Sequence, residues 1–399
     1  MAEATALGPV KVLDLAEDRG LFAGKMLADF GADVIKVEKP AGSRARSVPP
    51  FKDDLLGLES SLYFINFNTN KRGVTLDIDL PAGKEILKKL VARADVVIED
   101  FDPGVMGLKG LDYSSLKLLN RGIVMASITG FGQDGPYSQY RAPDIVNFAM
   151  GGLMYSSGTA NAPPVAAPGE QAYHGASILA VSAILAALFL RRKTGEGQLV
   201  DVSAHEVMAS QNHEQIMRYS TRFDIGGRTG SQHSAAPARI FPCKDGHVHL
   251  SVLRANQWRS FLELVGKPDV LTDSMWDDAF LRRRNNDLID PYAEEYTRSR
   301  NKAEISEICQ SKGIPCTPVN TPRDFSRDPH IKAREFITEV EHPVIGRHSY
   351  LGSAYRLSRT PCRVSRPAPL LGQHNQEIFG GELGYSGEEL ASLKTEGAI

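Results

Sequence analysis

The residues at the start of one long apolar stretch are the first candidates for chemistry. Glu170 directly precedes this stretch, and Tyr173 and His174 lie at its beginning. If a helix begins here, its dipole and free backbone N–H groups keep a nearby carboxylate ionised. The same N–H groups can stabilise an oxyanion, so the place suits a carboxylate nucleophile that attacks a thioester. Glu170 is the nearest candidate nucleophile. We interpret His174 as a cap or packing residue rather than a base.

The stretch itself predicts a single helix inside a protein core. Residues 178–190 are apolar nearly all round, and the basic residues 191–193 complement the negative end of the helix dipole. Gly195 follows where a left-handed helix end favours a residue without a Cβ. Residues 199–203 then show the alternation and β-branching of a strand. The apolar run is shorter than the roughly 20 residues that a bilayer requires, so we expect no membrane span.

Composition excludes several classes of protein. The 399 residues are enough for a large domain and a smaller one, and a net charge of -2 argues against a nucleic-acid partner. The four cysteines form no Cys-x-x-Cys pair, and His247 and His249 lack a third ligand at metal spacing. We therefore predict reduced thiols and no metal. The amino terminus lacks the features of a signal peptide, which predicts a cytoplasmic protein.

The beginning of the chain predicts a parallel sheet. Residues 10–15 read as a strand, 26–30 as part of a helix and 33–38 as a second strand, which is the spacing of a βαβ unit. A dinucleotide-binding fold needs Gly-x-Gly-x-x-Gly at the first turn, and residues 17–24 do not match that pattern. The sequence favours an α/β fold without a dinucleotide site.

Several motifs resemble, in order and spacing, the class III CoA-transferases of the formyl-CoA:oxalate and carnitine type. They are residues 31–38, 68–77, 94–99, 127–137, 191–198, 313–319 and 368–374. The resemblance implies a large Rossmann-like parallel-sheet domain at 1–225, a smaller α+β domain at 226–342, and a return to the large domain at 343–399. It further implies an interlocked, ring-like dimer. The implied reaction moves CoA between an acyl-CoA and an organic acid through an aspartyl anhydride, without a tightly bound cofactor.

The sequence departs from the family at the nucleophile. Counting back from residues 184–188, the family's catalytic Asp falls on Tyr173, and the nearest carboxylate is Glu170. The chain has no Asp at this place. It is therefore expected to lack the attacking group that the family uses.

The expected CoA site departs as well. The family's CoA contacts correspond to Lys39, Leu76, Phe101 and Lys109. The departures from the family pattern are Asp79, Asp100, Asp102 and Leu108. Phosphates are normally met by Arg, Lys and helix N-termini, so three acids and a lost cation are expected to weaken CoA binding.

Three hypotheses remain. The preferred one is a non-catalytic subunit that pairs with a homologous subunit carrying the Asp, as in the two-subunit benzylsuccinate CoA-transferases of the family. That partner would bind most of the CoA, and the parallel suggests succinyl-CoA as the donor. The second is an active CoA-transferase that uses Glu170. The third is a non-enzymatic protein that binds an acyl-CoA or an organic acid.

Overall fold

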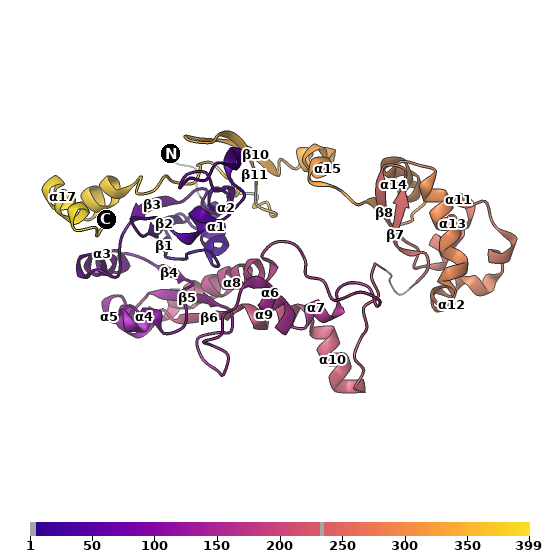
Figure 1. The fold of residues 1–399 in the computed structure, drawn as a ribbon, viewed down its shortest axis with the longest axis horizontal. Helices are drawn as coiled ribbons and strands as arrows, with labels where there is room; N and C mark the ends of the chain where they lie inside the picture. Colours follow the sequence, from indigo (N-terminus) through magenta and orange to yellow (C-terminus); the bar gives the residue numbers. More distant parts are fainter. Residues whose placement is uncertain (1–4, 232–234) are drawn as a thin grey trace. The chain divides into compact units, whose positions relative to one another are not determined.

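The computed structural model describes residues 5–231 and 235–399 (Figure 1). The chain divides into two compact units. The first comprises the chain up to Leu153, Ala166–Thr221 and His330–Ile399, and the second comprises Met154–Val165 and Arg222–Pro329. The second unit is therefore discontinuous, and its longer segment begins at Arg222, where the sequence predicted residue 226. Its end differs from the predicted 342, because the hairpin that contains residues 337–342 belongs to the first unit.

A six-stranded parallel sheet forms the centre of the first unit, which confirms the predicted α/β class. Its order is β3-β2-β1-β4-β5-β6. The strands are β1 Lys11–Asp14, β2 Asp33–Glu38, β3 Arg72–Thr75, β4 Val96–Glu99, β5 Val124–Thr129 and β6 Leu199–Ser203. Val12 lies opposite both Val34 and Val96, so the order reverses on the two sides of β1. In such sheets ligands bind beyond the carboxyl ends of the strands at this reversal.

The helices of this part of the chain connect the strands or follow them. They are α1 Leu21–Asp29, α2 Leu62–Phe67, α3 Pro81–Val91, α4 Val105–Leu108, α5 Tyr113–Leu119, α6 Asp144–Met150, α7 Leu153–Ser156, α8 Gln171–Thr194, α9 Ala204–Gln211 and α10 His213–Arg222. The first turn of α3 contains Pro81, whose fixed φ suits a helix start, and its buried Ile86 and Leu90 face the core. This local pattern explains why α3 covers the sheet.

Helix α8 has the predicted bounds. It begins at Gln171 and ends at Thr194, where Gly195 adopts a positive φ of 74°. Small side chains such as Ala176 and Ala180 are buried and allow close approach to α1 and β5. The opposite side exposes apolar residues, including Ile178 and Phe189, so burial all round is wrong. By length and hydropathy, α8 is the one helix within the described residues that could cross a membrane.

The end of the chain covers the sheet's edge strand β3, as the predicted return to the large domain requires. The Gly73 N–H donates to His374 Nδ1 at 3.0 Å, and the His374 N–H donates to the Gly73 carbonyl at 2.9 Å. The Thr75 N–H donates to Asn375 Oδ1 at 2.9 Å. The last helix, α17 Gly387–Thr395, begins with a capping box at Ser386. Backbone groups that an edge strand would leave unpaired are thus satisfied.

The second unit combines a small antiparallel sheet with helices. Its strands are β7 Ala238–Cys243, β8 Gly246–Ser251 and β9 Cys316–Pro318. Its helices include α11 Ala255–Leu264, α12 Ala279–Arg284, α13 Asn286–Arg298, α14 Lys302–Ser311 and α15 Pro322–Arg327. A tight turn at Lys244 and Asp245 joins β7 and β8. Trp258 and Phe261 lie in the hydrophobic core of the second unit. After α16 Pro329–Ala333, the hairpin of β10 Ile337–His342 and β11 Gly346–Leu351 belongs to the first unit.

Candidate active site

A cavity of about 360 Å³ lies at the start of α8. Its walls come from the segments that follow β1, β4 and β5, and from the first residues of α8. It therefore occupies the end of the sheet where the strand order reverses. Glu170 and Tyr173 both line it, so the structure brings together the two residues that the sequence singled out.

Tyr173 is a buried, hydrogen-bonded phenol. The residue is 2% exposed, and its hydroxyl donates to the Ala142 carbonyl at 2.5 Å. The Arg19 guanidinium lies 5.7 Å from the centre of its ring. Burial raises the pKa of Tyr173 to about 12, although the Arg19 charge opposes that shift. The hydroxyl is therefore protonated at neutral pH, and it uses its proton in the hydrogen bond to the Ala142 carbonyl.

Asp144 is a residue of this site that sequence reasoning missed. As the first residue of α6, it accepts a hydrogen bond from the Tyr173 N–H at 3.0 Å through Oδ1. A carboxylate of the same chain thus occupies the amino end of α8, where the dipole favours negative charge. Burial raises the pKa of Asp144, and the hydrogen bond from Tyr173 opposes that rise. Asp144 lies 29 residues before Tyr173, so no local pattern announces the contact.

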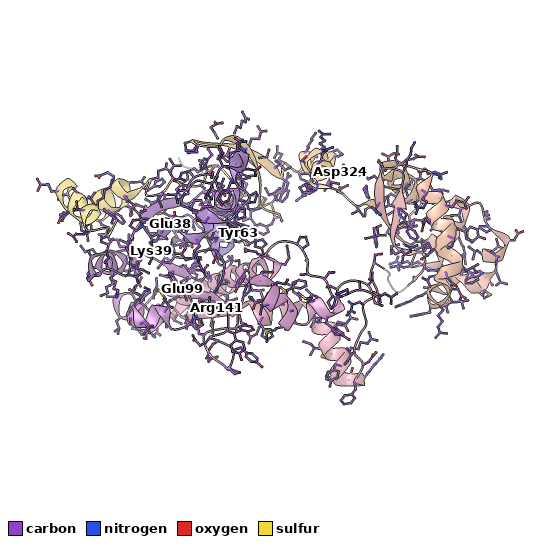
Figure 2. The ribbon with its side chains drawn as sticks, in the orientation of Figure 1. Glu38, Lys39, Tyr63, Glu99, Arg141 and Asp324 are labelled. Atoms are coloured by element: carbon purple, nitrogen blue, oxygen red, sulfur yellow. The ribbon has the colours of Figure 1, made fainter. Side chains whose placement is uncertain are left out.

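Glu170 contacts α2 rather than the free N–H groups of α8. Its Oε2 accepts a hydrogen bond from the Tyr63 hydroxyl at 2.5 Å, and that hydroxyl also lies 2.8 Å from the Asp18 carbonyl. Tyr63 is labelled in Figure 2. One hydroxyl proton cannot serve both acceptors. The Tyr63 hydroxyl donates to Glu170 Oε2 in the shorter of the two contacts. Burial raises the pKa of Glu170, and the hydrogen bond from Tyr63 opposes that rise.

Most other charges around this cavity are paired. Arg19 lies 3.3 Å from Asp102, and Arg44 lies 3.1 Å from Asp18. Burial, followed by repulsion from Asp100, raises the pKa of Asp18 to about 6. The cavity wall is thus a set of neutralising pairs rather than a field of one sign.

A second cavity, of about 190 Å³, contains all four residues expected to contact CoA. Lys39, Leu76, Phe101 and Lys109 line it together with Asp79. Asp79 Oδ2 lies 2.7 Å from Lys39 Nζ, and its other oxygen pairs with Lys109 Nζ. One substituted acid therefore neutralises both lysines that would meet an anionic ligand.

The remaining departures occupy different surroundings. Asp100 is 0% exposed, lines neither cavity, and accepts backbone N–H hydrogen bonds at 2.7 to 3.1 Å from each of residues 17–20. The Asp102 side chain is 77% exposed and borders the first cavity. Leu108 is 91% exposed and borders neither. Asp79 alone among the departures lies beside the predicted CoA contacts.

No metal centre is evident among the residues that the structure describes. Within residues 5–231 and 235–399, no group of three or more His, Cys, Asp or Glu side chains could hold a metal ion. All four cysteines are free thiols.

Comparison with known proteins supplies the family. Residues 7–375 match the model of CoA-transferase family III. A formyl-CoA:oxalate CoA-transferase of Streptomyces coelicolor is 33% identical over 99% of this chain and 100% of its own length. The BbsE subunit of succinyl-CoA:(R)-benzylsuccinate CoA-transferase of Thauera aromatica is 34% identical over 98% of this chain and 97% of its own. A CAIB/BAIF family protein from Brucella suis superposes with a TM-score of 0.86, at 31% identity over 95% of this chain and 100% of its own. The chain therefore belongs to the family III CoA-transferases.

Proposed function

We propose that this chain is the non-catalytic subunit of a heteromeric CoA-transferase, and that a homologous subunit supplies the catalytic Asp. The observation that carries the proposal is the pair of side chains found at the amino end of α8. A neutral phenol, Tyr173, stands at the expected nucleophile position, and Asp144 already occupies the N–H group that could stabilise an oxyanion. The similarity to BbsE, which is named as a subunit of its enzyme, supports a paired arrangement.

In the proposed reaction the partner subunit performs every covalent step. Its Asp attacks the carbonyl carbon of an acyl-CoA, with succinyl-CoA as the proposed donor. The C–S bond breaks, CoA thiolate leaves, and an acyl-aspartyl anhydride forms. The carboxylate of the organic acid then attacks this anhydride, releases the first acid and forms a second anhydride. CoA thiolate attacks the second anhydride, which yields the new thioester and restores the Asp.

Tyr173 is poorly suited to replace that Asp. With a pKa of about 12, its phenolate is rare at neutral pH, and ionisation would break its hydrogen bond to Ala142. An aryl ester formed on it would also lie in a buried pocket whose nearest helix N–H is occupied by Asp144. We therefore assign Tyr173 a packing role that closes the former nucleophile site.

This subunit is also proposed to bind CoA more weakly than its partner. The Asp79 carboxylate pairs with both Lys39 and Lys109, so an incoming phosphate must compete with an internal anion. Most of the CoA in the complex would then occupy the partner's site. Calorimetry should give one CoA for each pair of unlike subunits.

A second candidate is an active transferase that uses Glu170. Its support is that Glu170 lines the same cavity as Tyr173. However, the Glu170 carboxyl is hydrogen-bonded to Tyr63, and burial raises its pKa. An attack would require it to give up this contact.

Trapping the acyl-enzyme distinguishes the two candidates. The chain is co-expressed with an Asp-bearing homologue, the complex is mixed with succinyl-CoA, and hydroxylamine is added. Mass spectrometry then locates the hydroxamate, because hydroxylamine attacks an acyl-carboxyl anhydride. We expect a hydroxamate on the partner's Asp alone. A hydroxamate on Glu170, or a homodimer that transfers CoA unaided, would overturn the proposal in favour of the second candidate.

A further inference from the structure

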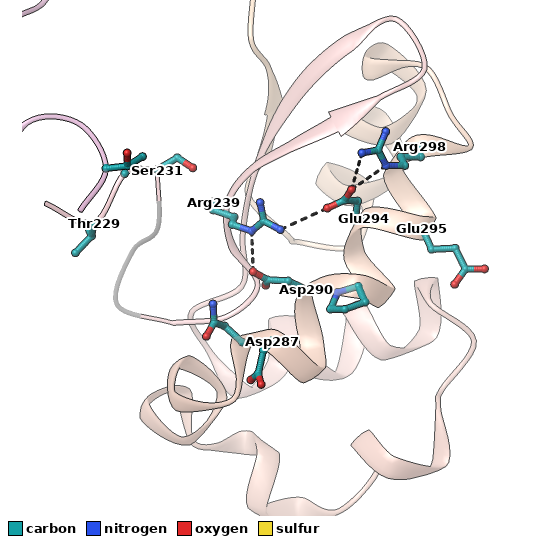
Figure 3. Close-up of a pocket in the computed structure, with 12 residues that line it drawn as sticks. Thr229, Ser231, Arg239, Asp287, Asp290, Glu294, Glu295 and Arg298 are labelled. Carbon is teal, nitrogen blue, oxygen red and sulfur yellow. Dashed lines mark hydrogen bonds and ion pairs between the residues drawn. The ribbon is translucent and has the colours of Figure 1, made fainter. Parts of the chain in front are cut away.

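Two nucleophilic side chains of the second unit have no place in the acyl-transfer site. They are the free thiols of Cys309 and Cys316. A cavity of about 870 Å³ lies along α13 of the same unit, and paired charges such as Arg239 and Asp290 line it (Figure 3). Neither cysteine lines that cavity. The two thiols lie instead in the hydrophobic core of the unit, where each cysteine is 1% exposed.

The packing of α14 on β9 brings the two thiols together. Cys309 lies in the last turn of α14, and Cys316 is the first residue of β9. The Cys316 carbonyl accepts hydrogen bonds from Ser306 Oγ and Gln310 Nε2, each at 2.9 Å. These two residues flank Cys309 on one face of α14, so β9 begins against that face. The thiols of Cys309 and Cys316 are hydrogen-bonded to each other.

The hydrogen bond between the thiols makes their acidities unequal. It lowers the pKa of Cys309, which burial opposes, and together with burial it raises the pKa of Cys316. Cys316 is thus the donor, and Cys309 is the first of the two to ionise. The thiolate is the reactive form of a cysteine, so Cys309 is the nucleophile of the pair.

Tyr296 of α13 adds a hydrogen-bond donor near the pair. Its hydroxyl is buried and has no hydrogen-bond partner among the residues that the structure describes. Burial raises the pKa of Tyr296, and negative charge on the sulfur of Cys309 or Cys316 raises it further. This phenol therefore stays protonated beside the two sulfurs, where an O–H group favours a thiolate.

The pair lies directly beneath an exposed part of the chain. Residues 310–313, which follow Cys309 and lead toward β9, are exposed. Because helix ends fray, opening of the last turn of α14 uncovers Cys309 to a small oxidant without unfolding of the whole unit. A zinc site does not explain the pair, since no group of three metal-binding side chains occurs within residues 5–231 and 235–399.

We propose that Cys309 and Cys316 are a redox-sensitive modification site, at which hydrogen peroxide forms a reversible disulfide between α14 and β9. The Cys309 thiolate attacks one oxygen of the peroxide, the O–O bond breaks, and hydroxide leaves as a sulfenic acid forms. The Cys316 thiol then attacks the sulfenic sulfur, and an S–S bond forms as water leaves. The hydroxide takes up the proton that Cys309 had released. Two thiols and one peroxide thus give one disulfide and two waters. This chemistry does not depend on the proposed function.

Peptide mapping after mild oxidation tests the site. The full-length protein is purified under reducing conditions in the assembly that it forms, treated with a small excess of hydrogen peroxide, and alkylated with iodoacetamide under denaturing conditions. Trypsin cleaves after Lys312, so Cys309 and Cys316 leave in separate peptides unless a disulfide joins them. We expect linked peptides from most chains, and two free thiols again after dithiothreitol. The proposal is overturned if both thiols stay free at peroxide concentrations that oxidise the partly exposed Cys243 and Cys362.

Matched variants assign the role of each sulfur. Cys316→Ser should abolish the linked peptides and leave a sulfenic acid on Cys309, which dimedone traps. Cys309→Ser should leave roughly tenfold less dimedone adduct on Cys316, because that thiol ionises less readily. Cys362→Ser, in the first unit, is the control and should leave the linkage unchanged.

Cys243 of the second unit provides the sharpest alternative, since its charge also influences Cys316. We expect Cys243→Ser to form the linked peptides as the wild type does. Loss of the linkage in this variant, or a peptide in which Cys243 is joined to Cys316, would show that the pair is wrongly assigned. The mapping of the wild-type protein needs no variant, so the test stands even if a substitution in the core prevents folding.

Discussion

The two cavities of the first unit depart from family expectations in different ways. At the start of α8, the reacting group itself is replaced, since Tyr173 is a neutral phenol. At the predicted CoA contacts, the expected lysines are present but paired with Asp79. Reactivity in the first cavity needs a new functional group, whereas the charge of the second depends on a single acid. A site can thus lose its activity because the reacting side chain is replaced, or because its cations are paired with an acid of the same chain. In the second case, removal of that one acid frees the cations again.

The largest expected effect is that of Asp100→Ala, which would displace a segment that lines both cavities. Residues 17–20 contribute Glu17 to the second cavity and Asp18 and Arg19 to the first, and Asp100 holds this segment through its four backbone N–H groups. Asp100→Ala leaves these groups without their acceptor. We expect a loss of roughly 3–5 kcal/mol in the free energy of unfolding, measured by urea denaturation.

Asp102→Ala is the matched control for that change. Its carboxylate is mostly exposed and makes one ion pair, with Arg19. The expected loss is within about 0.5 kcal/mol. If both variants lost the same stability, Asp100 would not be the residue that positions the segment between the cavities.

The next largest expected effect is on the pH dependence of stability, and it concerns Glu99. This residue lies just before Phe101, which lines the second cavity, and Asp102, which lines the first. Burial raises the pKa of Glu99 from the ordinary 4.5 to about 7. The folded chain therefore binds more protons than the unfolded chain between these values, so stability falls as pH rises from about 4.5 to 7. Glu99→Gln removes this penalty and should stabilise the protein by roughly 2–3 kcal/mol at pH 8.

Urea denaturation at several pH values measures the Glu99 contribution. The advantage of the Gln variant over wild type should shrink as pH falls toward 5, where Glu99 is protonated in the folded protein. Asp18, whose pKa is raised to about 6, adds a slope of the same sign in both proteins. Parallel pH profiles for wild type and variant would contradict the prediction.

A smaller effect sharpens the contrast between the cavities. Asp79→Ala frees Lys39 and Lys109 to meet an anionic ligand. The affinity of this subunit for CoA should rise about tenfold, since each charge-assisted contact contributes roughly 1.5–3 kcal/mol before screening. Calorimetry with a partner subunit disabled for CoA binding isolates this site. Unchanged affinity would show that neutralised lysines are not the cause of weak binding.

The smallest expected effect is at Glu170. In the heteromer, Glu170→Gln should change turnover less than about twofold, because the amide keeps the contact with Tyr63 and no anhydride forms on this residue. Steady-state transfer with succinyl-CoA measures it. If Glu170 were the nucleophile, the same substitution would lower turnover by several orders of magnitude.

Adding the family carboxylate completes the comparison. Tyr173→Asp places an acid at the start of α8, beside the existing Asp144. We expect no activity from this second site, because like charges so close oppose ionisation and Asp79 still neutralises the CoA-facing lysines. Hydroxylamine trapping of this chain is the measurement. A hydroxamate on residue 173 would show that the missing carboxylate was the only defect.

The features that local patterns specify could be predicted from the sequence. The βαβ opening and the bounds of α8 follow from alternation, the apolar run and the position of Gly195. Among the side chains that line the second cavity, Lys39, Leu76, Asp79, Phe101 and Lys109 were also named from family motifs. In contrast, the contact of Asp144 with α8 and the burial of Asp100 join segments distant in sequence. These contacts arise from tertiary packing, so they cannot be predicted from the pattern of neighbouring residues in the sequence.

The covering of β3 by the end of the chain has a consequence for biosynthesis. The groups that satisfy Gly73 and Thr75 belong to His374 and Asn375, which leave the ribosome some 300 residues later. Until then a nascent chain carries an uncovered strand edge, which is a template for pairing with other chains. At roughly 5–20 residues per second, this exposure lasts tens of seconds. We therefore expect the edge of β3 to be open to pairing with other chains during most of the synthesis of the protein.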